Sequence, residues 1–461
     1  MTDTSLAHDQ DSKRYPLSFT QEWFLTLDKG DDGGPFSPRY LIVSALRITG
    51  PVDLAVLQGA LDDVVARHEL LRTLVVRDAS PPYQQVCPPC RVPLEVRDLP
   101  QASGQQSGES RIMVIQKLLL EVEAGTMSTR EVPLLRALLC RFDDRDSALF
   151  LTVHHSVSDG WSTQLILHDF GAFYAARVSG IPPKLPQMRQ YREFAEWQRT
   201  SAESTEDDGA LKYWTEKLDG ARETVMPNDH GHPDLYSRPY SLHVFSIDAG
   251  IMAGASALAT ATRGTLFTVM LSVIYVLMNQ ITGVTDVLVP AITAGRNEVQ
   301  FNNTMGLFLN VLPFRTDIAD CTSFRDIVLK TRETFIDAMA NELPAGLLEQ
   351  TFPDYIRSRD DRRTSQLLIS VAQSQYGRKK TLPIAEGAKE TGTELLQEEV
   401  SSDIPTGTVW YLSAGPDGPL YGAMHYNRDE FEERTAESWS AGFKRILTSA
   451  ASDPDQDWRQ L

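Results

Sequence analysis

The sequence predicts an α/β protein built from two subdomains of related layout. Its 461 residues exceed what one hydrophobic core usually serves. Segments with strand and helix patterns alternate, and the order strand, helix, helix, strand occurs in both halves. A stretch rich in proline and glycine, residues 178–188, lies between the halves and is the best candidate for a linker.

The first half begins with residues 1–14, which are polar and predict a disordered lead. Apolar and β-branched residues predict a strand over 40–50, and Pro51 and Asp53 then begin a helix with an apolar stripe. Two apolar runs on either side of the charged turn 143–146 predict a hairpin, and another helix follows it.

The second half repeats this order less regularly. It predicts a strand over 240–248, helices over 249–264 and 265–283, and a strand over 286–296. Two further strands on either side of the turn at residues 415–418 come near the end. A helix from about Glu430 to Ala450 closes the chain.

The charge balance of the chain argues against several function classes. There are 62 acidic and 44 basic residues, and the net charge of −18 would repel a nucleic-acid backbone. The N-terminus has no apolar core of a signal peptide. The longest apolar run, residues 266–278, is too short to span a bilayer and predicts a buried helix. The sequence therefore predicts a cytoplasmic protein that binds neither nucleic acid nor membrane.

The four cysteines do not form a disulfide framework. Cys87 and Cys90 make a Cys-Pro-Pro-Cys pair, which could be redox-active or half of a zinc site. Cys140 and Cys321 stand alone, so the further ligands that zinc needs are missing. We expect free thiols in a proline-rich loop and no metal.

One stretch, LFLTVHHSVSDGWS at residues 149–162, combines a strand with chemistry-bearing side chains. A histidine at the end of a strand can be held rigidly, and its pKa near neutrality suits proton transfer. His154 and His155 follow one another on the strand, so they face opposite sides and should have different tasks. Asp159 lies four residues further on. A His–Asp pair alone is also compatible with a purely structural contact.

The stretch HHSVSDG matches His-His-x-x-x-Asp-Gly and resembles the core motif of condensation domains from nonribosomal peptide synthesis. Four other segments resemble motifs of that family and occur in its order, so the resemblance covers about residues 15–455. These segments are LSFTQEW (17–23), RHELLRT (67–73), YREFAEW (191–197) and AGRNEVQFNNTMGLFLNVLPFR (294–315).

The resemblance implies two chloramphenicol acetyltransferase-like subdomains, residues 15–180 and 181–461, in a V-shaped pseudo-dimer. A central tunnel would receive the phosphopantetheine arm of an acyl or peptidyl carrier protein from one face. A small alcohol or amine acceptor would enter from the other. The enzyme would transfer an acyl or aminoacyl group from the carrier thioester to that acceptor, forming an ester or an amide. It would bind no cofactor of its own.

The resemblance also implies roles for residues of the motif. His155 would take the proton of the attacking group or orient it. His154 and Asp159 would maintain the loop, with Asp159 paired to Arg296. Gly160 would keep the tunnel open and bring its N–H near the developing oxyanion.

Other residues near these motifs have two interpretations each. Trp161 and Ser162 could line the tunnel, although a packed ring and a helix N-cap is the simpler interpretation. Asn310 could face the tunnel or satisfy a strand end. The remaining motif residues are expected to brace the fold or pack, namely Arg67, Arg72, Tyr191 and Trp197.

Several positions depart from the family pattern, which bears on substrates more than on activity. The chain has NELPAGLLEQ from Asn341 where His-Gln-Asp-Tyr-Pro-Phe-Glu is usual, and Thr20 and Trp23 replace an alanine and an arginine of the opening motif. No adenylation or carrier signature is present, so the sequence predicts a freestanding condensation enzyme, with a domain excised from a longer chain as the alternative. The diverged later motifs favour an alcohol acceptor.

Three alternatives remain open. The first is a CoA-dependent O-acyltransferase of the wider superfamily, which shares His-x-x-x-Asp. The second is an epimerase-type relative, which a chain without a carrier disfavours. The third is a catalytically silent module that recruits partners to a carrier. Such modules typically lose the second histidine or the glycine, whereas this chain keeps His155 and Gly160.

Overall fold

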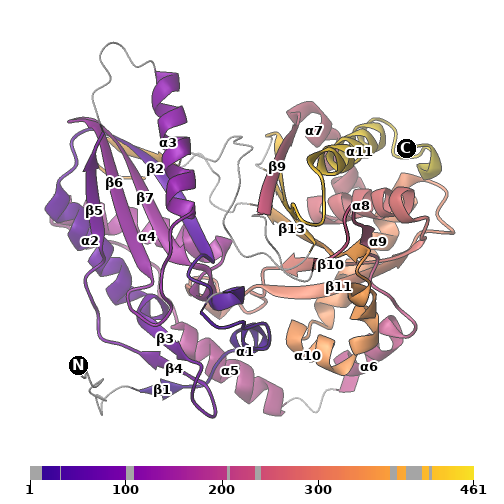
Figure 1. Cartoon of the computed structure of the whole chain (residues 1–461), viewed down its shortest axis with the longest axis horizontal. Coiled ribbons are helices and arrows are strands. Elements are labelled where there is room, and N and C mark those ends of the chain that lie inside the picture. The colour runs from indigo at the N-terminus through magenta and orange to yellow at the C-terminus, as the bar shows by residue number, and fades with distance from the viewer. Residues whose placement is uncertain are drawn as a thin grey trace. The chain divides into compact units, whose positions relative to one another are not determined.

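Helices and strands alternate through both halves of the chain, which confirms the predicted α/β class (Figure 1). The structure is a computed structural model that describes residues 13–31, 33–99, 108–204, 208–233, 240–373, 382–390, 407–414 and 418–461. Residues 1–12 of the predicted lead lie outside these ranges, and β1 begins at Arg14.

The chain divides into two compact units. The first comprises Met1–Thr205, Arg296–Phe308 and Thr381–Thr391, and the second comprises Glu206–Gly295, Leu309–Lys380 and Gly392–Leu461. The helices and strands of the first unit are, in chain order, β1 (Arg14–Tyr15), α1 (Phe19–Thr26), β2 (Leu41–Thr49), α2 (Leu54–Arg67), β3 (Thr73–Val76), β4 (Tyr83–Val86), β5 (Leu94–Asp98), α3 (Gly108–Glu123), β6 (Leu135–Asp143), β7 (Asp146–His154), α4 (Gly160–Ser179), α5 (Tyr191–Ser204) and β14 (Gly387–Glu390).

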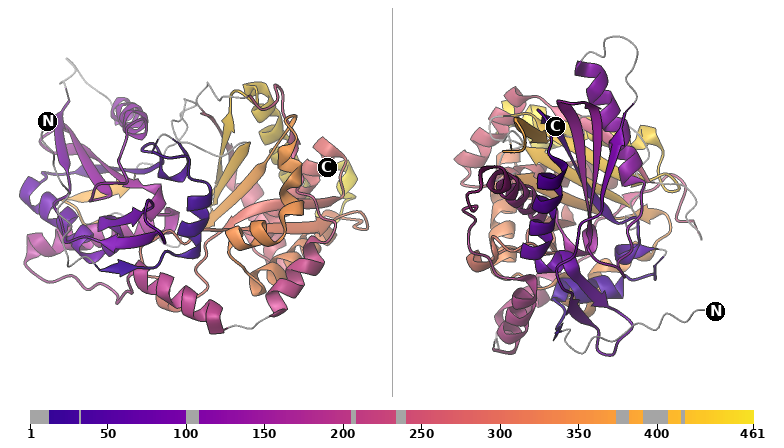
Figure 2. Two further views of the ribbon diagram at one scale, coloured as in Figure 1. Left: turned by 60° about the horizontal axis from the view of Figure 1, so that its bottom comes forward. Right: turned by 90° about the vertical axis from the view of Figure 1, so that its left-hand side faces the viewer.

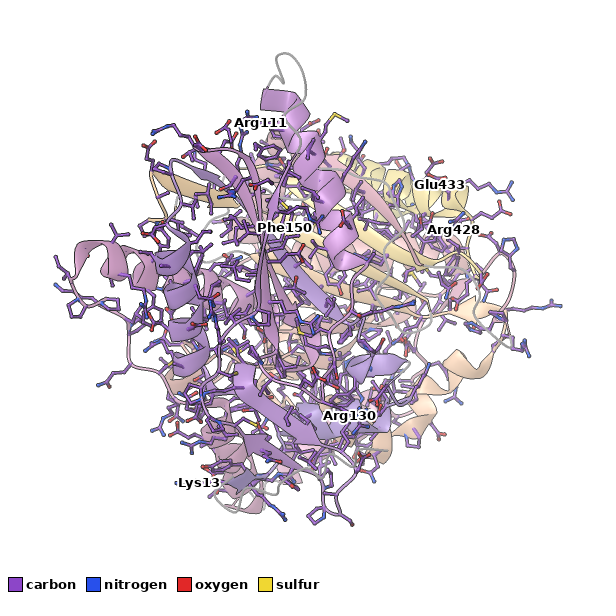
Figure 3. All side chains as sticks on the ribbon, turned by 60° about the vertical axis from the view of Figure 1, so that its left-hand side comes forward. Lys13, Arg111, Arg130, Phe150, Arg428 and Glu433 are labelled. Atoms are coloured by element: carbon purple, nitrogen blue, oxygen red, sulfur yellow. The ribbon has the colours of Figure 1, made fainter. Side chains whose placement is uncertain are left out.

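The main sheet of the first unit has the strand order β14-β2-β7-β6-β5. The predicted hairpin is present, because β6 and β7 pair antiparallel across the charged turn. Every residue of β7 is buried, as expected of a strand that is covered on both faces. Helix α3 packs on one face through Ile115 and Leu119 against side chains such as Phe150, which Figure 3 labels. Helices α2 and α4 pack together on the other side of the strands (Figure 1).

One edge of this sheet comes from far along the chain. Strand β14 pairs antiparallel with β2, so that Gly387 lies opposite Thr49 and Glu390 lies opposite Leu46. Figure 2 shows this orange strand beside the purple strands of the first unit. No local sequence pattern predicted this contribution, since the partners are more than three hundred residues apart.

The predicted subdomain boundary at residue 180 differs from the division into units. Residues 181–190 form no helix or strand, as a linker should, but α5 still belongs to the first unit. The physical reason is the buried phenol of Tyr191, which hydrogen-bonds to Ser18 Oγ at 2.7 Å and to the carbonyl oxygen of Leu307 at 2.6 Å. These bonds keep the start of α5 with the first unit.

The second unit has a six-stranded sheet of the order β11-β10-β13-β15-β16-β9. Its helices and strands are, in chain order, α6 (Asp208–Leu218), β8 (Met226–Pro227), β9 (Tyr240–Ile247), α7 (Ala249–Ala261), α8 (Leu266–Thr282), β10 (Asp286–Thr293), β11 (Asn310–Asp317), α9 (Phe324–Ala340), α10 (Ala345–Thr351), β12 (Thr364–Ser365), β13 (Leu367–Gln373), β15 (Thr408–Ala414), β16 (Leu420–Asn427) and α11 (Glu433–Ser452). Residues 415–417 of the predicted turn lie outside the described ranges.

The core of the second unit lies between this sheet and the helices α7, α8, α9 and α11 (Figure 1). Residues 268–278 of α8 are all buried, so the longest apolar run of the sequence is a core helix, as predicted. Within the described residues, no single helix is long and apolar enough to cross a membrane. Helices α7 and α8 meet that test only together, as a pair bent by 106°.

Candidate active site

The motif HHSVSDG lies where β7 ends and α4 begins. β7 is paired with β2 up to its last residue, with His154 opposite Leu41. The next backbone N–H, that of His155, donates to the carbonyl oxygen of Tyr40 at 2.8 Å. A single 3-10 turn over His155–Val157 then leads toward α4. The two histidines are therefore held by the sheet, and the aspartate is held by the helix.

His154 is fully buried and uses both ring nitrogens in hydrogen bonds. Nε2 lies 2.9 Å from the carbonyl oxygen of Ser37 and must donate, so Nδ1 is the acceptor for the backbone N–H of Ser156 at 3.1 Å. Ser156 Oγ lies 2.8 Å from the same Nδ1. Burial lowers the pKa of His154 to about 4, so the ring is neutral near pH 7. It has no nitrogen left for proton transfer.

His155 is only partly buried, in contrast to its neighbour. Its ring lies parallel to that of Tyr40, with centroids 4.5 Å apart and 7° between the planes. Burial lowers the pKa of His155, while the nearby Asp159 carboxylate has the opposite effect on that pKa. A neutral imidazole at pH 7 can accept a proton, which is what a general base requires.

Asp159 connects the motif to a second segment of the chain. Its Oδ1 accepts the backbone N–H of Ser162 at 2.7 Å, which makes Asp159 the N-cap of α4. Its Oδ2 accepts the backbone N–H of Phe308 at 3.0 Å. Arg296 Nη2 lies 3.4 Å from Oδ1, so the structure brings together the two residues that the sequence predicted as a pair.

Arg296 is buried, with its side chain 2% exposed, and holds the 299–308 segment against α4. Nη1 donates to the carbonyl oxygens of Phe301 and Thr304, at 3.1 and 2.8 Å. Nη2 donates to Ser162 Oγ at 2.8 Å. The guanidinium also lies 3.8 Å from the centre of the Phe308 ring, where cation–π attraction adds to the hydrogen bonds.

The interpretation of Ser162 as a helix N-cap is wrong, because Asp159 holds that position. Ser162 instead bridges α4 to the same segment: its Oγ donates to the carbonyl oxygen of Gly306 at 2.6 Å and lies 2.9 Å from the Gly306 nitrogen. Trp161 is partly buried, and its Nε1–H donates to the carbonyl oxygen of Asn302 at 3.0 Å. Both side chains therefore form hydrogen bonds to the backbone of residues 302–306.

Asn310 belongs to the second unit, and its amide is engaged there. Nδ2 donates to Glu342 Oε1 at 2.8 Å and to the carbonyl oxygen of Leu343 at 2.9 Å. Oδ1 accepts the backbone N–H of Ala345 at 2.8 Å. Of the two interpretations of Asn310, these bonds favour the satisfied strand end.

The RHELLRT segment braces the first unit through contacts with α4 and with the backbone. Arg67 Nε and His68 Nε2 lie 2.7 and 3.0 Å from the same oxygen of Asp169, which is buried in α4. Hydrogen bonds to His68 and His168 and the charges of His68 and Arg67 lower the pKa of Asp169 to about 2, although burial alone would raise it. Arg72 donates to the backbone carbonyl oxygens of Val65 and Cys87.

Sequence reasoning missed three residues that hold the site. Ser37 accepts from His154, Tyr40 stacks on His155, and Phe24 of α1 lies 6.2 Å from the Tyr40 ring. Tyr40 begins the predicted strand 40–50, and the predicted hairpin strand ends at the histidines. Antiparallel pairing of those two strands was the signal that could have placed Tyr40 beside His155.

Within the described residues, no group of three or more histidine, cysteine, aspartate or glutamate side chains could hold a metal ion. Cys87 and Cys90 are both partly buried free thiols, and burial raises the pKa of each.

This arrangement defines an acyltransferase-like α/β protein of the chloramphenicol acetyltransferase type, with a partly exposed imidazole at the end of a strand. A family model described as Condensation domain matches residues 11–461, and the chain belongs to that family. Condensation domains are acyl-transfer catalysts of nonribosomal peptide and related natural-product biosynthesis, and they work with carrier proteins.

Curated relatives are far longer than this chain. A linear gramicidin synthase of Brevibacillus parabrevis is 30% identical over 456 residues, which are 97% of this chain and 8% of that protein. The dimodular nonribosomal peptide synthase of Bacillus subtilis is 30% identical over 459 residues, which are 96% of this chain and 18% of that protein. The chain thus spans only a small part of the length of these relatives.

Solved structures agree in fold along nearly the whole chain. SgcC5 from Streptomyces globisporus, solved in complex with (R)-(-)-1-(2-naphthyl)-1,2-ethanediol and sucrose, is 33% identical with a TM-score of 0.86. The match covers 96% of this chain and 100% of that one. The X-domain from teicoplanin biosynthesis, at 23% identity and a TM-score of 0.77, shares the fold.

The Asp159–Arg296 pair should be a determinant of stability. Asp159→Ala removes the cap of α4 and leaves the buried guanidinium without its carboxylate, which costs roughly 3–5 kcal/mol of unfolding free energy. Asp98→Ala is a matched control, because Asp98 pairs with Arg141 at 2.6 Å but is 72% exposed. We expect urea unfolding to show a large loss for the first variant and almost none for the second. Equal losses would contradict this account.

Two glycines of the motifs should differ sharply in their tolerance of a methyl group. A Cβ at Gly306 would overlap the buried Tyr191 ring, so Gly306→Ala should lower stability by roughly 1–3 kcal/mol. A Cβ at Gly160 would have no described heavy atom within 4 Å, so Gly160→Ala should leave the melting temperature unchanged. Thermal unfolding of both variants checks this, and a large loss in Gly160→Ala would contradict it.

Proposed function

We propose that the chain transfers an acyl or aminoacyl group from a carrier-protein phosphopantetheine thioester to a hydroxyl group of a small acceptor, forming an ester. The observation that carries this proposal is the difference between the two histidines. His154 is buried with both nitrogens engaged, whereas His155 is partly exposed, stacked and neutral. One imidazole supports the loop, and the other remains for chemistry.

The reaction we propose balances with His155 as the only proton carrier. The imidazole takes the proton of the acceptor hydroxyl while the hydroxyl oxygen attacks the thioester carbonyl carbon. The tetrahedral intermediate then collapses, the carbon–sulfur bond breaks, and the imidazolium returns its proton to the leaving thiolate. The products are an ester and the free thiol of the carrier arm.

The start of α4 supports the proposal from a second side. Gly160 is the first residue of this 20-residue helix, and the N-terminal end of a helix favours negative charge. Gly160 has an exposed backbone without a side chain, so a carbonyl oxygen could approach its N–H. We propose that this N–H stabilises the oxyanion. Holding both reactants in place supplies on the order of 7 kcal/mol or more of the barrier reduction, so His155 need contribute only part.

The proposed classes of donor and acceptor are inferred from similar proteins. Family membership favours a carrier-tethered donor over acyl-CoA. SgcC5 was solved with an aryl 1,2-diol, which favours a hydroxyl acceptor over an amine. The intact HHxxxDG motif with His155 and Gly160 argues against the silent recruiting module.

The donor and acceptor classes can be separated in one panel. The chain is given the same acyl group on a carrier protein and on CoA, each with alcohol and amine acceptors of matched size, and the products are identified by mass spectrometry. We expect ester from the carrier donor with the alcohol. The carrier is supplied as a separate protein, so the panel also tests the expectation that the chain acts freestanding. Preferred use of acyl-CoA, or amide as the main product, would overturn the corresponding part of the proposal.

Removing the His155 side chain should stop turnover without unfolding the protein. We expect His155→Ala to lower kcat by at least about 10²-fold, the usual range for loss of a general base, with the melting temperature nearly unchanged. His230→Ala, a change of an exposed histidine in the second unit, should retain both. If His155→Ala kept most of the turnover, proton transfer by that ring would be excluded.

The pH dependence should reflect the burial of His155. Because burial lowers its pKa below the ordinary 6.5, the ring stays neutral and able to accept a proton until the pH falls below that value. The acid limb of the kcat/KM profile should therefore have its midpoint below pH 6.5. Far-ultraviolet circular dichroism across the same range confirms that the fold persists. A midpoint at or above pH 6.5 would contradict this assignment.

A further inference from the structure

The ring of His155 has a face-to-face aromatic neighbour that the sequence motif does not contain. Tyr40 lies parallel to it at 4.5 Å between centroids, with 7° between the planes. Offset or stacked contacts at this distance are favourable between flat π systems. Tyr40 lies immediately before β2, outside HHSVSDG.

Two further contacts hold Tyr40 in place, one through its backbone and one through its ring. Its backbone carbonyl oxygen accepts the N–H of His155 at 2.8 Å, so the two residues are fixed side by side at the end of the β2–β7 ladder. On the side of α1, the buried Phe24 lies 6.2 Å from the Tyr40 ring at 59°. A layer of three rings, Phe24, Tyr40 and His155, thus connects α1 to the end of β7.

Hydrogen bonds fix the ring of His155 less completely than that of His154. Nδ1 of His155 is buried and has no partner of good hydrogen-bond geometry within the described part of the chain, but backbone hydrogen bonding with His155 itself and with Ser158 raises the pKa of the ring. A histidine that acts as a base usually has its second nitrogen fixed by such a bond. His154, with two bonded nitrogens, shows the alternative. The χ2 torsion of a histidine has a broad energy minimum, so a fixed orientation of the ring requires a neighbouring group that limits χ2.

We propose that Tyr40 is a positioning residue for His155: its ring restricts the imidazole to one plane and so directs the reactive nitrogen toward the acceptor hydroxyl. This inference rests on the proposed function, because it assumes that His155 is the base. The ring of Tyr40 is the part that acts, and its hydroxyl is not required. A base held in one orientation loses less freedom on reaching the transition state, and a misplacement of about 1 Å can cost up to about 10²-fold in rate.

The test uses Tyr40→Phe, which keeps the stacked ring, and Tyr40→Leu, which removes it. Tyr83→Leu is the matched control, because Tyr83 lies on β4 in the same unit and contacts Arg14. For each variant we would measure kcat and KM for carrier-dependent ester formation, the melting temperature, and the ring-proton resonances of His155 by NMR. A His155→Ala spectrum assigns those resonances.

We expect Tyr40→Phe to retain kcat within about threefold and to keep the upfield shift that a stacked ring imposes on the His155 protons. Tyr40→Leu should lower kcat roughly tenfold or more with KM within about threefold, and should lose that shift. Tyr83→Leu should match the wild type in both readouts.

The proposal is overturned if Tyr40→Leu keeps kcat, or if Tyr40→Phe falls as far as Tyr40→Leu, since the hydroxyl would then carry the effect. It is also overturned if the His155 resonances are unchanged in Tyr40→Leu. The NMR readout needs no turnover, so a stack that is present in an inactive wild type would count against the proposed reaction and not against the stacking.

Discussion

The site depends on one buried carboxylate. Asp159 caps α4 with one oxygen and accepts the backbone N–H of Phe308 with the other, while Arg296 neutralises its charge. Two segments that are separate in the chain, the start of α4 and residues 299–308, are thereby held together. Burying such a pair is costly unless its remaining hydrogen-bonding groups are satisfied. Nη1 of Arg296 is satisfied by carbonyl oxygens of the 299–308 segment.

Around this point, the two histidines of the motif are held by different kinds of force. Polar contacts fix His154, which is sealed in the interior between Ser37 and Ser156. His155 is held by aromatic packing: its ring stacks on Tyr40, which in turn packs against Phe24 of α1. The opening segment LSFTQEW and the residue after it therefore support the site: Ser18 bonds to Tyr191, and Phe24 packs against Tyr40. Motifs that are distant in the sequence thus pack together in the first unit and jointly hold the two histidines.

Much of the fold was predictable, because periodic apolar patterns have a direct structural meaning. The strand at residues 40–50, the hairpin and the apolar helix α8 follow from burial on one or both faces of an element. The resemblance to condensation domains implied the pairing of Asp159 with Arg296, which the structure shows, and the role of His155, which stays a prediction. Three features did not follow from these patterns, although pairing the two predicted strands would have placed Tyr40 near His155. β14 joins the sheet from residue 387, Tyr191 keeps α5 in the first unit, and Tyr40 stacks on His155. Each depends on a partner far away in the chain, and single-sequence patterns do not record partners.

The edge strand β14 has a consequence for the order in which the molecule is made. The first unit takes its framework from residues up to 205, yet its sheet is completed by residues 387–390 and its buried guanidinium comes from residue 296. During synthesis on the ribosome, residues 387–390 must emerge before the first unit's main sheet gains its edge strand β14. The first unit can therefore reach its final form only after residues 206–295 and 309–380 of the second unit have been synthesised.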